Sequence, residues 1–184
     1  MSRLRIQQRT RIYLGCEGQS EQSYAVRLSQ IAESAGLYLA IDNDIPRPGG
    51  DPLDLVRSAI RRAKEQQAKR GSFDFRALLL DRDKLGVAPE RDEQISKLAR
   101  VNRLHLIWQR PCHEGFLLRH LEGHENTSPP TTDLASQALK RIWTDYHKPM
   151  SAIHLASRID LQAVLRACSV ESSFKQFLDQ IGLR

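Results

Sequence analysis

Cysteines, aromatic residues and long hydrophobic runs are all scarce in this sequence. Cys16, Cys112 and Cys168 are odd in number, far apart and in no C-x-x-C spacing, so neither a disulfide framework nor a zinc ribbon is predicted. No apolar run approaches the roughly 20 residues that a membrane-spanning helix needs, and no signal peptide is visible at the N-terminus. Aromatic residues make up only 6% of the chain, which argues against a stacking platform for single strands. We therefore expect a cytoplasmic protein with reduced thiols.

The remaining composition is typical of one globular domain. The chain has 184 residues, of which 40% are hydrophobic and 27% charged, and this length is enough to bury a proper core. We expect a single domain over 1–184, divided into an α/β core over 1–125 and a helical C-terminal part over 126–184.

Positive charge is in excess, with a formal net charge of +6. It gathers at the N-terminus and in one later segment, namely at Arg3, Arg5, Arg9 and Arg11, and at Arg57, Arg61, Arg62, Lys64, Lys69 and Arg70. Such clusters favour polyanions through counterion release, so nucleic acid is the predicted partner and Arg61, Arg62, Lys69 and Arg70 are candidate contacts. A solvated helix face is the alternative for either cluster.

Hydrophobic periodicity predicts strands that alternate with helices. The predicted strands are 10–16, 37–42, 75–80 and 104–108. The predicted helices are 20–35, 52–69, 89–101, 111–122, 134–146, 151–168 and 172–181. Asp51 and Pro52 provide a cap and a first-turn proline for the second helix. This alternation predicts an α/β fold with a mostly parallel sheet flanked by helices, followed by a helical C-terminal tail.

The third predicted strand, FRALLL, is almost continuously apolar and ends abruptly at Asp81, Arg82 and Asp83. Side chains alternate along a strand, so Asp81 and Asp83 are expected on the same side of its carboxyl end, where ligands bind in open α/β sheets. Two crowded carboxylates repel each other unless a cation lies between them. We interpret this Asp-x-Asp pair as a candidate site for Mg²⁺ or Mn²⁺. A polar strand-to-loop turn is the alternative.

Two other acidic positions are predicted at the same edge. Glu17 follows the first strand, and Glu114 falls in the first turn of the helix that begins near Pro111. Glu21 lies one turn beyond Glu17. Because hard cations prefer oxygen ligands and keep several waters, a few carboxylates suffice. Acidic residues at a helix start are also common for dipole reasons, which is the alternative for Glu17 and Glu21.

A zinc site is a weaker hypothesis for the segment that follows the fourth strand. Cys112, His120 and His124 include a His-x-x-x-His spacing that suits a metal on one helix face. Gly123 makes helical structure through His124 doubtful, so a polar helix face is the favoured interpretation.

Three blocks, taken in order, resemble the RloB family. IYLGCEGQSEQSY, from Ile12, is similar to that family's opening of a strand, Cys-Glu-Gly, a Thr-Glu-like pair and an aromatic residue. LLLDRD resembles its Asp-x-Asp strand. QRPCHEGFLLRHLE, from Gln109, resembles its block Ser-Asn-Pro-x-Phe-Glu-x-Trp-hydrophobic-hydrophobic-x-His. The segment around YHKP fits loosely, so the resemblance spans nearly the whole chain.

Membership would imply a Toprim-like, Rossmann-like fold, shared with topoisomerases, primases and OLD-family nucleases. It would also imply metal-dependent nuclease chemistry in bacterial or archaeal phage defence, often beside restriction-modification genes. By this resemblance, Glu17 matches the first Toprim glutamate, and Asp81 and Asp83 match the Asp-x-Asp pair. Glu114 matches the glutamate of the third block, and His120 matches the histidine of that block. The chain departs from the pattern at Gln109, Arg110, His113, Gly115 and Phe116, which surround the carboxylates and bear on the shape of the pocket.

The leading hypothesis is therefore a Mg²⁺- or Mn²⁺-dependent nuclease. Asp81, Asp83 and Glu114 would hold metal, and Glu17 would act as a ligand or general base. Lys148, with Arg110, would steady developing phosphate charge, although a solvated loop lysine is the alternative for Lys148. A partner ATPase from the same locus is a further expectation.

Two other classes of function stay open. One is a non-catalytic module that binds nucleic acid or a partner protein. The other is a phosphotransfer or nucleotide-hydrolysing enzyme, against which the missing G-x-x-x-x-G-K-[ST] motif counts.

Overall fold

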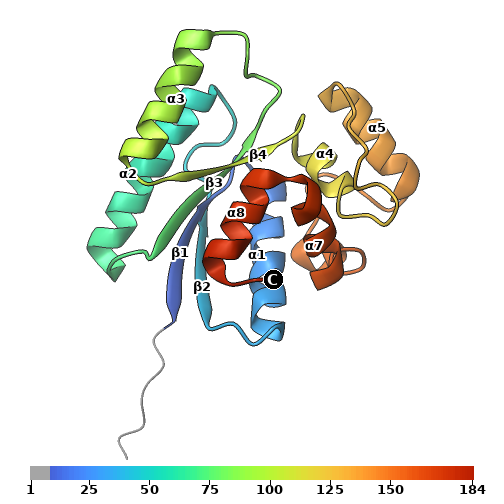
Figure 1. Ribbon diagram of the computed structural model, residues 1–184, viewed down its shortest axis with the longest axis horizontal. Coiled ribbons are helices and arrows are strands. Elements are labelled where there is room, and N and C mark those ends of the chain that lie inside the picture. Colours follow the sequence, from blue (N-terminus) through green and yellow to red (C-terminus); the bar gives the residue numbers. More distant parts are fainter. Residues whose placement is uncertain (1–8) are drawn as a thin grey trace, which may run out of the picture.

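The centre of the protein is a four-stranded, all-parallel sheet (Figure 1). The computed structural model describes residues 9–184, so Arg3 and Arg5 lie outside the described part. The strands are β1 (Thr10–Gly15), β2 (Leu39–Asp44), β3 (Phe75–Asp81) and β4 (His105–Gln109), and their order in the sheet is β2-β1-β3-β4. This confirms the predicted α/β fold with a parallel sheet.

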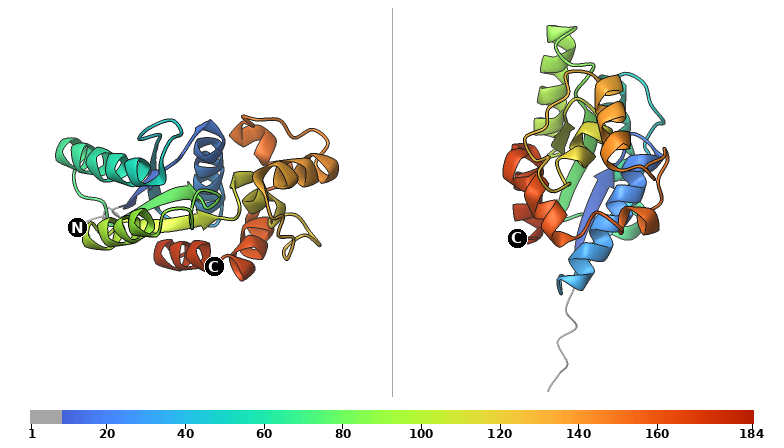
Figure 2. Two further views of the ribbon diagram at one scale, coloured as in Figure 1. Left: turned by 90° about the horizontal axis from the view of Figure 1, so that it is seen from above. Right: turned by 90° about the vertical axis from the view of Figure 1, so that its right-hand side faces the viewer.

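Eight helices are described, and the longer ones cover both faces of the sheet (Figures 1 and 2). They are α1 (Gln19–Ser34), α2 (Pro52–Arg70), α3 (Pro89–Val101), α4 (His113–Leu118), α5 (Thr132–Ile142), α6 (Ala152–Leu155), α7 (Leu161–Val170) and α8 (Ser172–Ile181). Helices α2 and α3 pack together on one face, whereas α1 and α8 lie on the other.

The apolar run of β3 is explained by burial on both faces. Ala77 and Leu79 belong to the core on the α1 side, and Leu78 and Leu80 belong to the core on the α2 side. All four are at most 1% exposed. Burying each leucine side chain contributes about 2 kcal/mol, so a strand in this position is apolar throughout.

The C-terminal helices share the core of the sheet. Phe174 and Phe177 of α8 are fully buried, and they pack in the same cluster as Ile12 of β1 and Leu79 of β3. In Figure 2 the C-terminal segment lies against the sheet layer rather than extending away from it. The predicted helical C-terminal end is therefore present, and its helix α8 covers one sheet face together with α1.

Some element boundaries differ from the sequence prediction. The segment 151–168 was expected as one helix but is divided into α6 and α7, because Asp160 caps a new helix by accepting a hydrogen bond from the backbone of Ala163 at 2.8 Å. Helix α4 is also shorter than expected and ends at Leu118. Strands β2 and β4 begin one or two residues later than predicted. None of the described helices is long and apolar enough to cross a membrane.

Candidate functional site

Glu17 and Asp81 meet at the carboxyl edge of the sheet. Strands β1 and β3 are parallel neighbours, with Gly15 opposite Leu78, so the residues that follow them emerge side by side. The Glu17 Oε2 atom accepts a hydrogen bond of 3.4 Å from the backbone nitrogen of Asp81. The two acidic residues predicted to share this edge are thus in contact.

Asp81 is the most strongly perturbed acid of this edge. Burial, and then the negative charges of Glu17, Glu21, Asp83 and Glu114, raise the pKa of Asp81 to about 9. Its Oδ1 atom is buried, and no described residue donates a hydrogen bond to it. A buried carboxyl without donors is costly to ionise, so Asp81 holds a proton at neutral pH unless a cation takes its place.

Asp83 lies at the surface, close enough for its charge to act on Asp81. Its Oδ2 atom accepts a hydrogen bond of 3.1 Å from the hydroxyl of Thr132, at the start of α5. Between the two aspartates, the backbone nitrogen of Arg82 donates to the carbonyl oxygens of Gln109 and Pro111, both at 3.0 Å. The acidic turn is therefore anchored to the end of β4, and Asp83 is held toward α5.

Glu114 reaches the same edge from the first turn of α4. Its carboxylate accepts hydrogen bonds from the Lys148 Nζ atom at 2.9 Å, the Tyr146 hydroxyl at 3.2 Å and the Cys112 thiol at 3.2 Å. Burial raises the pKa of Glu114, but the Lys148 ammonium and the other donors outweigh burial and lower the pKa to about 2. Glu114 is therefore a carboxylate at neutral pH. We call Glu17, Asp81 and Glu114 the carboxylate cluster.

The start of α4 requires a glycine at position 115. A Cβ atom on Gly115 would lie 2.3 Å from the carbonyl oxygen of Arg110 and 2.7 Å from Pro111 Cδ. Both neighbours belong to the loop that leaves β4. The loop therefore packs directly on the helix, and this close packing sets the position of Glu114.

A buried polar group lies beneath the cluster. Glu21, Gln109 and His113 are all at most 4% exposed. The Gln109 side-chain nitrogen lies 2.7 Å from the His113 Nδ1 atom, and the nearest Glu21 oxygen lies 4.0 Å from the same atom. Burial lowers the pKa of His113, so the ring is neutral and accepts the amide hydrogen of Gln109. Glu21 thus adds a carboxylate close to Asp81 without a charged partner of its own in this group.

The donor set suits a hard cation. Among residues 9–184, no three His, Cys, Asp or Glu side chains lie close enough together, as they stand, to hold a metal ion. However, Mg²⁺ keeps several waters and needs only one or two carboxylates. Glu17 and Asp81 supply these, and the Asp81 Oδ1 atom has no competing donor among the described residues. Lys148 and Tyr146 both bind the Oε1 atom of Glu114, whereas its Oε2 atom accepts only from the Cys112 thiol. The residues therefore fit Mg²⁺ or Mn²⁺.

The residues of the zinc hypothesis are not brought together. His120 is fully buried, and its two ring nitrogens bind the Tyr24 hydroxyl at 2.8 Å and the Phe116 carbonyl at 3.0 Å. Cys112 donates to Glu114. His120 is a core histidine, because both of its nitrogens are already used.

The basic residues are spread over the molecule. Helix α2 runs opposite to the strands, so Lys69 and Arg70 lie near the amino edge of the sheet, far from the carboxylate cluster. Arg62 pairs with Asp44 at 2.9 Å, and Arg61 lies 3.9 Å from Glu65 on the same helix. Nucleic-acid contacts by these residues stay a prediction.

The buried pair Arg119 and Glu171 forms a charge cluster with the partly exposed Arg110. Arg119 and Glu171 are each 2% exposed, and their closest atoms are 3.0 Å apart, while Arg110 lies 3.2 Å from Glu171. Arg119 also donates to the carbonyl oxygens of Arg110 at 2.6 Å and Gly115 at 2.8 Å. The Arg110 guanidinium is therefore engaged at the junction of α7 and α8, and its predicted role toward phosphate stays a prediction.

Sequence reasoning missed three groups at the site. Tyr146 donates to Glu114, Lys84 lies 3.9 Å from Glu17, and Arg119 joins α4 to Glu171. The position of Lys84 beside the acidic turn was a usable signal. Tyr146 and Arg119 contact residues more than 30 positions away in the chain, and no local sequence pattern predicts such pairs.

These observations define an α/β protein with a carboxylate cluster at the carboxyl edge of a parallel sheet. The description "RloB-like protein" matches residues 12–177, which is nearly the whole chain, and the protein therefore belongs to the RloB-like family. We found no match among curated proteins or solved structures.

Proposed function

We propose that this protein is a Mg²⁺- or Mn²⁺-dependent phosphodiesterase that cleaves nucleic acid. The observation that carries the proposal is the Asp81 Oδ1 atom, which is buried and receives no hydrogen bond from a described residue at the carboxyl edge of the sheet, with Glu17 bound to the Asp81 backbone nitrogen and Glu114 nearby. The RloB-like resemblance supports it by implying a Toprim-like fold and a role in phage defence. The positive net charge supports a polyanionic substrate.

Each residue of the cluster has a proposed part. Asp81 and Glu17 would hold the cation, which when bound supplies charge neutralisation at phosphate and an activated water. Glu17 is either a ligand or the general base that takes a proton from that water. Lys148 is half exposed, and its ammonium lies 2.9 Å from Glu114, so it can hold positive charge where phosphate would bind. Asp83 would bind metal or substrate from the surface side.

The test is a cleavage assay on three substrates. Purified protein is incubated with plasmid, single-stranded DNA and total RNA, each with Mg²⁺, Mn²⁺ or EDTA. We expect cleavage that needs the divalent cation and is lost in Asp81→Asn. Asp179→Asn is the matched control, because Asp179 is an exposed carboxylate paired with Lys175 on α8. Cleavage that persists in EDTA, or in Asp81→Asn, would contradict the proposal.

A non-catalytic binding module is the second candidate, and one observation favours it. Lys148 already neutralises Glu114 at 2.9 Å, so the cluster is partly satisfied without a metal. In that case the protein would bind nucleic acid or a partner protein, such as an ATPase from the same locus, and would never cut. Salt-sensitive binding with no cleavage under any metal condition would favour this candidate.

A further inference from the structure

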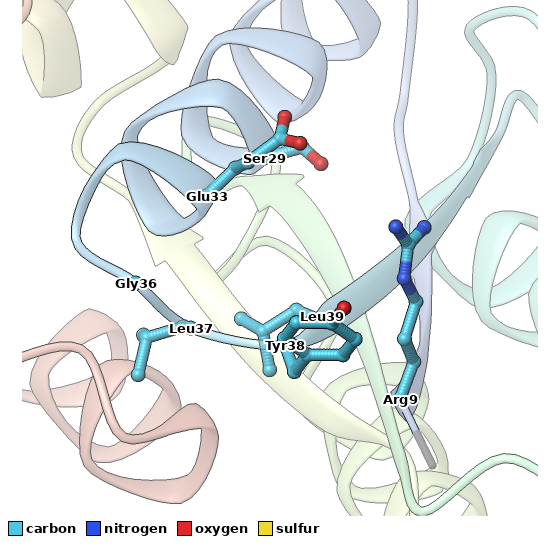
Figure 3. Close-up of a pocket in the computed structure, with 7 residues that line it drawn as sticks. All are labelled: Arg9, Ser29, Glu33, Gly36, Leu37, Tyr38 and Leu39. Atoms are coloured by element: carbon cyan, nitrogen blue, oxygen red, sulfur yellow. The ribbon is translucent and has the colours of Figure 1, made fainter. Parts of the chain in front are cut away.

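A hollow lies at the other end of the sheet from the carboxylate cluster. It has a volume of about 230 Å³ and is lined by Arg9, Ser29, Glu33, Gly36, Leu37, Tyr38 and Leu39. The lining comes from the C-terminal half of α1, the turn that follows it and the starts of β1 and β2 (Figure 3). Helix α1 therefore has the candidate active site at its first turn and this hollow at its last.

The hollow combines an acid, a guanidinium and an exposed aromatic ring. Figure 3 shows Glu33 on the α1 side, Arg9 on the other side and Tyr38 between them, with their polar ends around one space. Tyr38 is 54% exposed, and the guanidinium carbon of Arg9 lies 5.5 Å from the centre of its ring. Within the described part of the chain, Glu33 and Arg9 form no ion pair with each other or with a third residue.

We propose that this hollow binds an unstacked guanine base. A carboxylate only accepts hydrogen bonds, and a guanidinium only donates them, in a planar fork. Guanine is the one common base with two adjacent donors, N1–H and N2–H, on one edge and two adjacent acceptors, O6 and N7, on the other. Glu33 would accept from the donor edge, Arg9 would donate to the acceptor edge, and the Tyr38 ring would pack against the base.

The proposal deepens the proposed function, because it names a feature of the substrate strand. The sheet rises about 3.3 Å per residue, so the six residues of β1 separate the hollow from the carboxylate cluster by about 20 Å. At the 3.4 Å spacing of a stacked strand this is about six nucleotides, and fewer in an extended strand. A single strand bound through one guanine here would reach the carboxylate edge several nucleotides away.

The test compares three nucleotides that differ only at the base. GMP, IMP and AMP are titrated into the full chain in EDTA, and binding is followed by NMR. IMP lacks the N2 amine, so we expect GMP to bind about tenfold more tightly than IMP or AMP. Glu33→Gln should abolish this preference, because the amide places a donor against a base donor. Glu93→Gln, at an exposed position of α3 on the opposite sheet face, should retain it.

A second experiment tests whether the bound guanine belongs to a nucleic-acid strand or to a free nucleotide. Single strands that carry one guanine or one inosine are compared by fluorescence anisotropy, and we expect tighter binding of the guanine strand. GMP selectivity that the strands do not share would overturn the assignment to a strand in favour of a free nucleotide.

Two results would overturn the guanine site itself. One is equal binding of the three nucleotides by the wild type. The other is Glu33-dependent binding of L-leucine, a zwitterion that would also bridge an acid and a guanidinium, without any binding of GMP. Because the titration is run in EDTA and does not involve Asp81, these results leave the metal-dependent activity untouched.

Discussion

Replacing Asp81 by asparagine should stabilise the metal-free protein and remove its response to metal. Asparagine keeps the shape of the side chain and one acceptor oxygen, and it removes the titrating carboxyl. In the folded protein, burial and the neighbouring carboxylates raise the pKa of Asp81 to about 9, against an unfolded value of about 3.9. The folded state therefore holds a proton that the unfolded state releases, so wild-type stability falls as pH rises from about 4 to about 9.

The size of the effect follows from this difference. One pKa unit corresponds to about 1.4 kcal/mol, so at pH 8 the penalty has an upper limit of about 6 kcal/mol. Water penetration and local relaxation reduce such penalties in real proteins, and we expect Asp81→Asn to gain about 2 kcal/mol at pH 8. For a domain of this size that gain raises the melting temperature by about 4 to 8 °C. At pH 5, only about one unit above the unfolded value, the gain should be under 1 kcal/mol.

Both the gain in stability and the response to metal are measured by melting curves. These are recorded for the wild type and Asp81→Asn at pH 5 and pH 8, each with EDTA or Mg²⁺. Mg²⁺ should raise the melting temperature of the wild type, because a ligand that binds only the folded state stabilises it, and it should not affect the mutant. Asp179→Asn, an exposed carboxylate paired with Lys175 at 3.0 Å, controls for loss of one negative charge. A mutant that is about 1 kcal/mol less stable at both pH values, with no metal response in either protein, would make Asp81 a structural turn residue.

Three further predictions concern the supports of the site. Burial lowers the pKa of His120 to about 3, so its neutral ring contributes stability above pH 6.5 that is lost as pH falls toward 3. In urea unfolding at a series of pH values, the free energy of unfolding of His120→Gln should therefore fall less steeply with acid than that of the wild type. Equal pH dependence of the two proteins would contradict this. Gly115→Ala places a Cβ atom 2.3 Å from the Arg110 carbonyl and should cost about 3 kcal/mol in urea unfolding, whereas an unchanged midpoint would show that the loop yields. Glu171→Gln leaves Arg119, which is 2% exposed, without a full countercharge. The change should lower the free energy of unfolding by about 3 kcal/mol, and a double-mutant cycle with Arg119→Met tests whether this loss comes from the pair.

Local sequence patterns predict most of the secondary-structure elements and the strand end at Asp81. The apolar run of β3 stops at Asp81, and the structure ends the strand at that residue. Asp51 and Pro52 start α2 as expected, with Asp51 accepting from the backbone of Leu53 at 2.9 Å. Such signals are readable because capping and burial act within a few residues of chain.

Other features depend on contacts between residues that are distant in the sequence. Alternation along a strand predicts Asp81 and Asp83 on one side of β3; the structure ends β3 at Asp81 and adds a hydrogen bond from the Thr132 hydroxyl to Asp83, which no local pattern predicts. Clustering in the sequence groups Arg61 with Arg70, and the structure places them nine residues apart on α2, with Arg70 near the amino edge of the sheet. The sequence shows that these arginines are close along the chain, but only the orientation of α2 in the fold determines which part of the surface each one faces.

The helical C-terminal part completes the site. Glu114 belongs to α4, yet two of its three hydrogen-bond donors, Tyr146 and Lys148, come from the segment after α5. The start of α4 is also tied through Arg119 to Glu171, between α7 and α8. Without the Lys148 ammonium and the Tyr146 hydroxyl, the buried Glu114 would keep only the Cys112 thiol as a side-chain donor, so burial would dominate and raise the pKa of Glu114. Whatever the cluster binds, its charge state is therefore set jointly by the sheet and by the last third of the chain.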